Sequence, residues 1–237
     1  TDIGIAIDAP IEGDDIVSGA EATDGFVISG TAGSGDAIAV TFAGGSYTTT
    51  AGSDGAWSVI IPAADIPGGE ADATIGATAT DAAGNSADVT HDIRIDTVVQ
   101  PLTSNGVAAD GNGEVDDLVN RAEASDGITL TGTVEIGSTV SVTFEGTTRD
   151  AAVDAQGNWS VDFSVAEVPQ GEYDTTVSIS ATDAVGNTRT ITDTFEVDTT
   201  PPEAPTIESF TATNSGTIRE LTTSITSDDA VFVIDSG

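Results

Sequence analysis

Short apolar runs alternate with polar positions along the first part of the chain, and Gly, Asp and Asn separate the runs. The runs are rich in Val, Ile, Thr and Phe, and a period of two is typical of strands with one buried face. A sustained helical period is missing; only VSGAEA and VNRAEA suit a single helical turn. We therefore predict an all-β fold, with strands near residues 3–7, 26–32, 37–42, 46–50, 56–61, 71–80 and 86–95.

The same pattern occurs twice. Residues 1–97 align without a gap with residues 103–199, at a constant offset of 102 positions. GAWSV in the first copy matches GNWSV in the second, and TDAAGN matches TDAVGN. About seven strands in about 100 residues are typical of an immunoglobulin-like sandwich. We predict two such modules, at residues 1–97 and 98–199.

A proline-rich stretch, DTTPPEAP, follows the second copy, and its prolines favour an extended backbone. We interpret residues 200–237 as this linker and the start of a truncated third module. The chain starts and stops within the repeat pattern, so we expect it to be a segment of a longer protein. Tandem sandwiches joined by short linkers predict an extended rod.

Charge narrows the possible functions. The chain has 40 acidic and 5 basic residues and a formal net charge of −35. Such a field opposes binding to nucleic acid and to anionic membranes, and divalent cations are the expected counter-charge. The sequence has neither Cys nor Lys, which excludes disulfides and Lys–Asn isopeptide bonds. The longest apolar runs are far shorter than a membrane span.

The motifs together resemble a known family. AEA, ISGTA or LTGTV, GxWSV, ATDAxGN and DTTPP look like the bacterial Ig-like extender repeats of giant RTX-type and Bap-type secreted adhesins. The resemblance covers residues 1–199. It implies a secreted fibre at the bacterial cell surface, in which calcium stiffens the joints between adjacent modules. A host or surface glycan or protein would be bound elsewhere in the parent protein.

Acidic positions that recur in both copies are the candidate calcium ligands, because calcium takes six to eight oxygen ligands. Many of them fall in one turn after the first predicted strand. The predicted set comprises Asp8, Glu12, Asp14, Asp15, Asp81 and Asp96 in the first copy, and Asp110, Asn112, Glu114, Asp116, Asp117, Asp183, Asn187 and Asp198 in the second.

Topology suggests which of these groups meet. If strand direction alternates, the acidic turn and the end of the last strand lie at one end of a module, and the DAxGN hairpin lies at the other. Stacking the modules would bring Asp14, Asp15 and Asp96 of the first towards Asp183 and Asn187 of the second. We predict a calcium site at this joint.

Residues 107–119 are a second candidate, because oxygen-bearing side chains alternate there as in the first half of an EF-hand loop. The rest of that pattern fails: Val115 stands at the glycine position and Arg121 at the position of the bidentate glutamate. In the first copy, Pro10 replaces Asn112. An EF-hand is therefore not expected. A calcium site of another geometry and a solvated acidic turn both remain open.

Other residues suggest no further chemistry. We expect Trp57 and Trp159 in the sandwich cores, and His91 at the surface because Asp193 replaces it in the second copy. Catalysis is not expected, since the sequence lacks a recurring nucleophile–base pair and a phosphate-binding loop.

Three functions fit these observations. A structural extender of an adhesin is our prediction. The alternatives are a module that itself binds a glycan or a protein, and an acidic surface or filament protein adapted to high salt without specific calcium sites.

Overall fold

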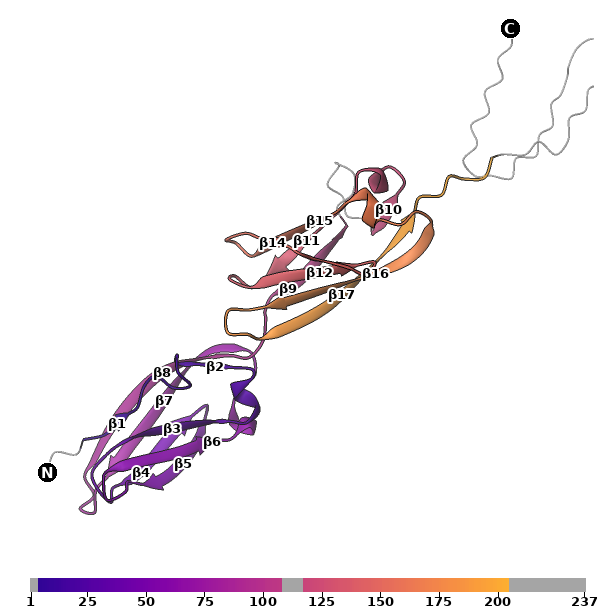
Figure 1. Ribbon diagram of the computed structural model, residues 1–237. Coiled ribbons are helices and arrows are strands. Elements are labelled where there is room, and N and C mark those ends of the chain that lie inside the picture. The colour runs from indigo at the N-terminus through magenta and orange to yellow at the C-terminus, as the bar shows by residue number, and fades with distance from the viewer. Residues whose placement is uncertain (1–3, 108–116, 205–237) are drawn as a thin grey trace, which may run out of the picture.

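The structure, a computed structural model, describes residues 4–107 and 117–204. Two β-sandwiches follow one another end to end (Figure 1). One hydrophobic core extends from Ile11 to Ile95 and a separate one from Val99 to Val197. The prediction of tandem immunoglobulin-like sandwiches in an extended arrangement is confirmed. Within the described residues, no helix is long and apolar enough to cross a membrane.

The first module pairs a three-stranded sheet, in the order β1-β3-β6, with a five-stranded sheet, in the order β2-β8-β7-β4-β5. Two short 3-10 turns lie between strands. The elements are β1 (Ala6–Ile7), β2 (Ile16–Ser18), η1 (Glu21–Thr23), β3 (Phe26–Thr31), β4 (Ala37–Phe42), β5 (Gly45–Thr50), β6 (Ala56–Ile61), η2 (Ala63–Asp65), β7 (Glu70–Thr80) and β8 (Ser86–Asp96).

The second module repeats this plan with one change. Its outer strand leaves one sheet after β13 and joins the other as β14, which gives the orders β10-β17-β16-β12-β13 and β14-β15-β11-β9. The elements are β9 (Leu102–Val107), β10 (Leu118–Asn120), η3 (Glu123–Ser125), β11 (Ile128–Val134), β12 (Thr139–Phe144), β13 (Thr147–Asp150), β14 (Ala152–Val153), β15 (Asn158–Phe163), η4 (Val165–Glu167), β16 (Glu172–Thr182) and β17 (Thr188–Asp198).

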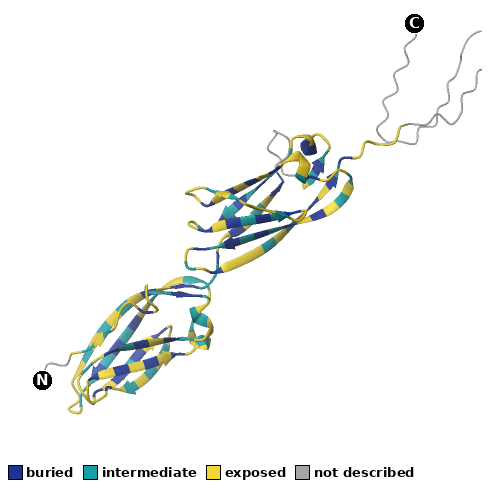
Figure 2. Ribbon diagram, viewed as in Figure 1, coloured by how far each residue is buried: buried dark blue, intermediate teal, exposed yellow. Residues whose placement is uncertain are grey.

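Burial follows the alternation read from the sequence (Figure 2). In β6, for example, every second side chain faces the core. Trp57 and Trp159 are 4% and 1% exposed, so the prediction that they are core residues is confirmed. Phe26 and Phe42 pack edge to face in the first core, where such aromatic pairs add to the hydrophobic burial.

The first strand of each module is split, which the sequence analysis did not predict. β1 pairs antiparallel with β3 in one sheet, whereas β2 pairs parallel with β8 in the other. The acidic segment 8–15 connects these two halves and therefore lies beside the module. β2 continues to the module end, where Ser18 pairs with Asp96. The expectation that the acidic turn forms the module end is therefore wrong.

Gly30 is required by close packing. A Cβ on Gly30 would overlap the main-chain oxygen of Ala6 and lie 2.5 Å from Trp57 Cζ2. We expect Gly30→Ala to lower the free energy of unfolding of the first module by about 2 kcal/mol or more, because the core must shift. Gly68→Ala is the control, since nothing lies within 4 Å of its Cβ position. Urea unfolding followed by circular dichroism measures both; equal effects would contradict the packing argument.

Candidate cation site at the joint between the modules

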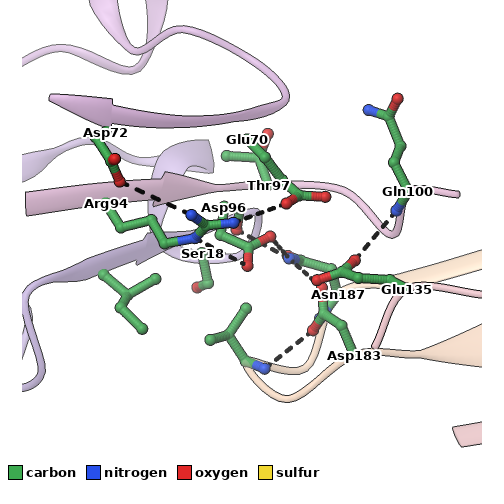
Figure 3. Close-up of polar contacts among 12 residues, drawn as sticks. Ser18, Glu70, Asp72, Arg94, Asp96, Thr97, Gln100, Glu135, Asp183 and Asn187 are labelled. Atoms are coloured by element: carbon green, nitrogen blue, oxygen red, sulfur yellow. Dashed lines mark hydrogen bonds and ion pairs between the residues drawn. The ribbon is translucent and has the colours of Figure 1, made fainter. Parts of the chain in front are cut away.

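The end of the first module meets two loops of the second (Figure 3). β7 begins at Glu70 and β8 ends at Asp96, and these two residues are directly opposed in the antiparallel register. The second module contributes Glu135, from the connection between β11 and β12, and the turn 183–187 between β16 and β17. Carboxylates and one amide from both modules therefore converge at the joint.

The side-chain amide of Asn187 links the two modules. Its Nδ2 donates to Asp183 Oδ2 at 2.7 Å, to the main-chain oxygen of Asp96 at 2.9 Å and to Asp96 Oδ1 at 3.1 Å. Its Oδ1 accepts from the N–H of Gly19 at 2.7 Å. Asn187 is 8% exposed. A buried amide with both ends engaged fixes the orientation of the groups around it.

Local sequence explains why Asn187 is held in place. Asp183 Oδ1 accepts from the N–H of Val185 at 3.0 Å and from that of Asn187 at 2.8 Å, so the carboxylate closes its own turn. Asp81 and Asn85 form the same turn in the first module, with Asn85 Nδ2 donating to Asp81 Oδ2 at 2.8 Å. In that turn Asp81 is partly exposed and Asn85 exposed, whereas Asp183 and Asn187 are both buried.

The linker is short and bound to the second module. Val99 is fully buried in the second core, and its main-chain oxygen accepts from Arg189 Nη1 at 3.3 Å. The N–H of Gln100 donates to Glu135 Oε2 at 3.1 Å. The linker therefore restricts how far the modules can separate, and it also positions Glu135.

Three carboxylates form the candidate cation site. Glu70, Asp96 and Glu135 each offer an oxygen, and these oxygens all lie within 4.8 Å of one another. Asp96 is 6% exposed, and the other two are partly buried. Carboxylate oxygens from a flexible set of side chains are the ligands that calcium takes in proteins.

Electrostatics at the joint favours added positive charge. Burial raises the pKa of Asp96, and the charges of Asp183 and Glu70 raise it further. Burial also raises the pKa of Glu135, against the hydrogen bond from Gln100, which lowers it. Both carboxyls are therefore harder to ionise than in water, first because they are buried and then because other carboxylates lie close to them.

One cation of the protein already lies beside the cluster. Arg94 Nη2 contacts Glu70 Oε2 at 2.7 Å, while Arg94 Nη1 is 3.8 Å from Asp72 Oδ1 and Arg94 Nε is 4.0 Å from Asp96 Oδ2. Only the contact with Glu70 is a hydrogen bond. The guanidinium therefore neutralises part of the charge from one side.

Among the residues predicted to meet at this joint, the structure brings Asp96, Asp183 and Asn187 together. It places the two other predicted members elsewhere. Asp14 Oδ1 accepts from the N–H of Ile16 at 3.0 Å, and Asp15 Oδ1 contacts His91 Nε2 at 2.6 Å. The position predicted for them was wrong because they precede β2 and so lie beside the module.

The position of His91 also differs from the surface position that we expected. His91 is half-buried and paired with Asp15, and it lies two residues before the buried Ile93, on the same face of β8. That contact, together with the hydrogen bond that Asp15 Oδ1 accepts from the N–H of Ile11 at 2.8 Å, holds the acidic segment against β8.

Other predicted ligands have local contacts or lie outside the description. Asp8 Oδ2 accepts from the Ser29 hydroxyl at 2.8 Å. Burial, followed by the charges of Glu21 and Asp24, raises the pKa of Glu12. Four predicted ligands fall outside the described residues: Asp110, Asn112, Glu114 and Asp116.

The remaining two predicted ligands belong to the second module. The main-chain oxygen of Asp117 accepts from the N–H of Glu196 at 2.9 Å, which fixes the start of β10. Asp198 Oδ1 accepts from the N–H and the hydroxyl of Thr200, at 3.0 and 2.8 Å. Asp198 corresponds to Asp96, and it lies at the far end of the second module.

Sequence reasoning missed two residues of the cluster. Glu70 recurs as Glu172, so its repetition was a usable signal, but only the β7–β8 register places it opposite Asp96. Glu135 corresponds to Gly33, and a search for recurring acidic positions therefore passes over it. Its position in the joint depends on the contact between modules, which a single module does not define.

Comparisons with known proteins agree with this architecture. Residues 10–97 match a family model described as a bacterial Ig-like domain, and residues 115–198 match one described as a bacterial Ig domain. No curated protein matches the chain.

Several solved structures are similar. One comes from a 1.5-MDa bacterial ice-binding adhesin studied for host cell surface retention; it is 28% identical over 84% of this chain, with a TM-score of 0.53. Another, from a calcium-stabilised adhesin with which an Antarctic bacterium binds ice, is 30% identical over 86%, with a TM-score of 0.45.

This chain spans 66% and 51% of those two structures. A bacterial immunoglobulin-like domain from the M. primoryensis ice-binding adhesin is 31% identical over 39% of this chain and 94% of its own length, with a TM-score of 0.31. Residues 10–97 and 115–198 therefore each belong to the bacterial immunoglobulin-like domains, two of which follow one another in this chain.

Proposed function

We propose that this chain is an extender segment of a secreted adhesin at the bacterial cell surface, and that a calcium ion at the joint fixes the orientation of successive modules. The observation that carries the proposal is the convergence of Glu70, Asp96 and Glu135 from two modules on one point. A cation bound there would attach the modules to each other directly. The likeness to a structure from a large adhesin supports the extender role.

The shape of the modules suits an extender. The longest strands, β7, β8, β16 and β17, each have 11 residues. At about 3.3 Å per residue they span about 35 Å along the module. Each further module would add a length of this order, so reach would increase with the number of repeats. We keep the predicted boundaries, at residues 1–97, 98–199 and 200–237, as part of this proposal.

Two parts of the joint would have different roles. Asn187 connects the modules without any cation, through its contacts with Asp96 and Gly19. The carboxylate cluster would add stiffness when calcium supplies the missing positive charge. Both ends of the Asn187 amide are already engaged, so we assign it to orienting the joint and not to binding calcium.

A glycan-binding surface built on the faces of Trp57 and Trp159 loses its support, because both side chains are buried. Binding of a glycan or a protein by the loops at one end of a module stays the alternative. In our proposal, recognition of a host or surface molecule is a property of other parts of the parent protein. Catalysis is not part of the proposal.

Calcium binding tests the proposed site. We expect Glu135→Gln to abolish one calcium-binding event in isothermal titration, or to weaken it at least about tenfold, because it removes a charged ligand. Asp88→Asn is the control, since Asp88 accepts from the Thr78 hydroxyl on an exposed face of the first module. Small-angle scattering should show a more extended and less variable particle with calcium than with chelator. Identical titrations for both variants would refute the site.

Asn187→Ala tests the direct link between the modules. We expect it to leave each module folded but to let the two tumble independently, because Asp96 and Gly19 lose their common partner. Asn85→Ala removes the same residue from the corresponding exposed turn and should leave the coupling intact. Backbone ¹⁵N relaxation gives a rotational correlation time for each module. Unchanged coupling in Asn187→Ala would contradict the role of the amide.

Acid should strengthen the joint in the absence of divalent cations. Asp96 and Glu135 have raised pKa values in the folded joint, so their protonation stabilises the contact between the modules. This stabilisation is fully present below the ordinary pKa values of 3.8 and 4.5, and it is lost as pH rises through the raised values. We expect the modules to become more firmly coupled as pH falls from neutral towards 4.5. The same relaxation experiment, in chelator, measures this. Glu135→Gln should flatten the dependence, and coupling that weakens on acidification would contradict the assignment.

A further inference from the structure

The far ends of the two modules differ in the placement of basic residues: Arg94 of the first module is replaced by Glu196, and Gly19 is replaced by Arg121, which follows β10. In each module two long strands come together there, β7 with β8 and β16 with β17. Position 94 in the first module is Arg, and the corresponding position 196 in the second is Glu. The other acidic positions are shared: Glu70, Asp72 and Asp96 recur as Glu172, Asp174 and Asp198.

In the first module the guanidinium lies among these carboxylates. Arg94 is directly opposed to Asp72 in the register and forms its shortest contact, 2.7 Å, with Glu70. It is also within 4.0 Å of Asp96, the most buried carboxylate of the joint. A guanidinium carries a permanent charge and forms directional hydrogen bonds with carboxylates, so it is an effective internal counter-ion.

In the second module, the positions that correspond to Glu70, Asp72, Arg94 and Asp96 all carry carboxylates. Glu196 is opposed to Asp174, and Glu172 is opposed to Asp198. In the described part of the chain, no ion pair reaches any of these four side chains. Like charges at directly opposed positions destabilise a strand pair, and they attract a divalent cation more strongly than the mixed end of the first module does.

We infer that Arg94 is a built-in counter-ion that competes with a divalent cation, so that the first joint keeps part of its order without calcium and binds calcium weakly. The inference rests on the proposed calcium site at the joint. At the corresponding position of the second module Glu196 replaces this arginine, so the strand pair β16–β17 has no guanidinium of its own there.

At a second position, too, a basic residue of the first module is replaced by an acidic residue in the second. His91 contacts Asp15 in the first module. The corresponding residues of the second module are Asp193 and Asp117, two carboxylates. Asp117 holds Glu196 through its main-chain oxygen just as Asp15 holds Arg94, so the backbone frame is conserved between the modules. At both positions the first module supplies a basic residue where the second has an acid.

Arg94→Glu tests the inference, because it gives the β7–β8 pair the charges that the β16–β17 pair has at the same positions. Isothermal titration with calcium should show the joint site, identified by its loss in Glu135→Gln, binding at least about tenfold more tightly in Arg94→Glu. In chelator, ¹⁵N relaxation should show independent modules in Arg94→Glu and coupled modules in the unsubstituted chain. Arg94→Gln removes the charge without adding a carboxylate and should give an intermediate affinity.

Arg149→Glu is the matched control, since it changes the net charge equally and breaks a similar ion pair, with Glu167, away from the joint. It should leave the calcium affinity of the joint unchanged. Calcium binding at the joint with equal affinity in Arg94→Glu and the unsubstituted chain would overturn the inference and leave the proposed function standing. Binding in Arg94→Glu alone would overturn the proposed calcium site of the natural joint and, with it, the inference that this joint binds calcium weakly. Absence of joint binding in both proteins would overturn both.

Discussion

The joint depends on how the buried carboxylate of Asp96 is compensated. A carboxylate that leaves water needs hydrogen-bond donors or positive charge close by. Asn187 of the neighbouring module supplies donors, and Arg94 of the same strand supplies part of the charge. Glu70 and Glu135 act in the opposite direction, because they bring more negative charge to the same point. The contact between modules is therefore held by an amide and is open to stabilisation by a cation.

The two modules share the same backbone arrangement but carry different charges at corresponding positions. The Asp–x–x–Gly–Asn turn closes on itself in both modules, through Asp81 in the first and Asp183 in the second. It becomes part of a joint only where another module covers it. Likewise, position 94 or 196 lies next to the same acidic neighbours whether it is Arg or Glu. Differences between joints can therefore arise from single substitutions without any change of fold.

Much of the fold could be predicted from the sequence, because strand alternation and the repeat are local signals. They placed Trp57 and Trp159 in the cores and brought Asp96 near Asn187. β2 was missed because three residues are too few to show a period, and this error misplaced Asp15. Glu135 was missed because its position in the site depends on the neighbouring module. The amide of Asn187 was expected to offer oxygen to a metal, but it turns its nitrogen towards the carboxylates.

The parallel pairing of β2 with β8 has a mechanical consequence. β2 lies near the start of the module and β8 at its end, so tension applied between the two ends of the module pulls these two strands in opposite directions. Because they run parallel, the hydrogen bonds between them are loaded together in shear and do not open one at a time. β10 and β17 repeat this arrangement in the second module. Each sandwich thus places a shear-loaded strand pair between its two points of attachment, which is a geometry that resists extension by an applied force.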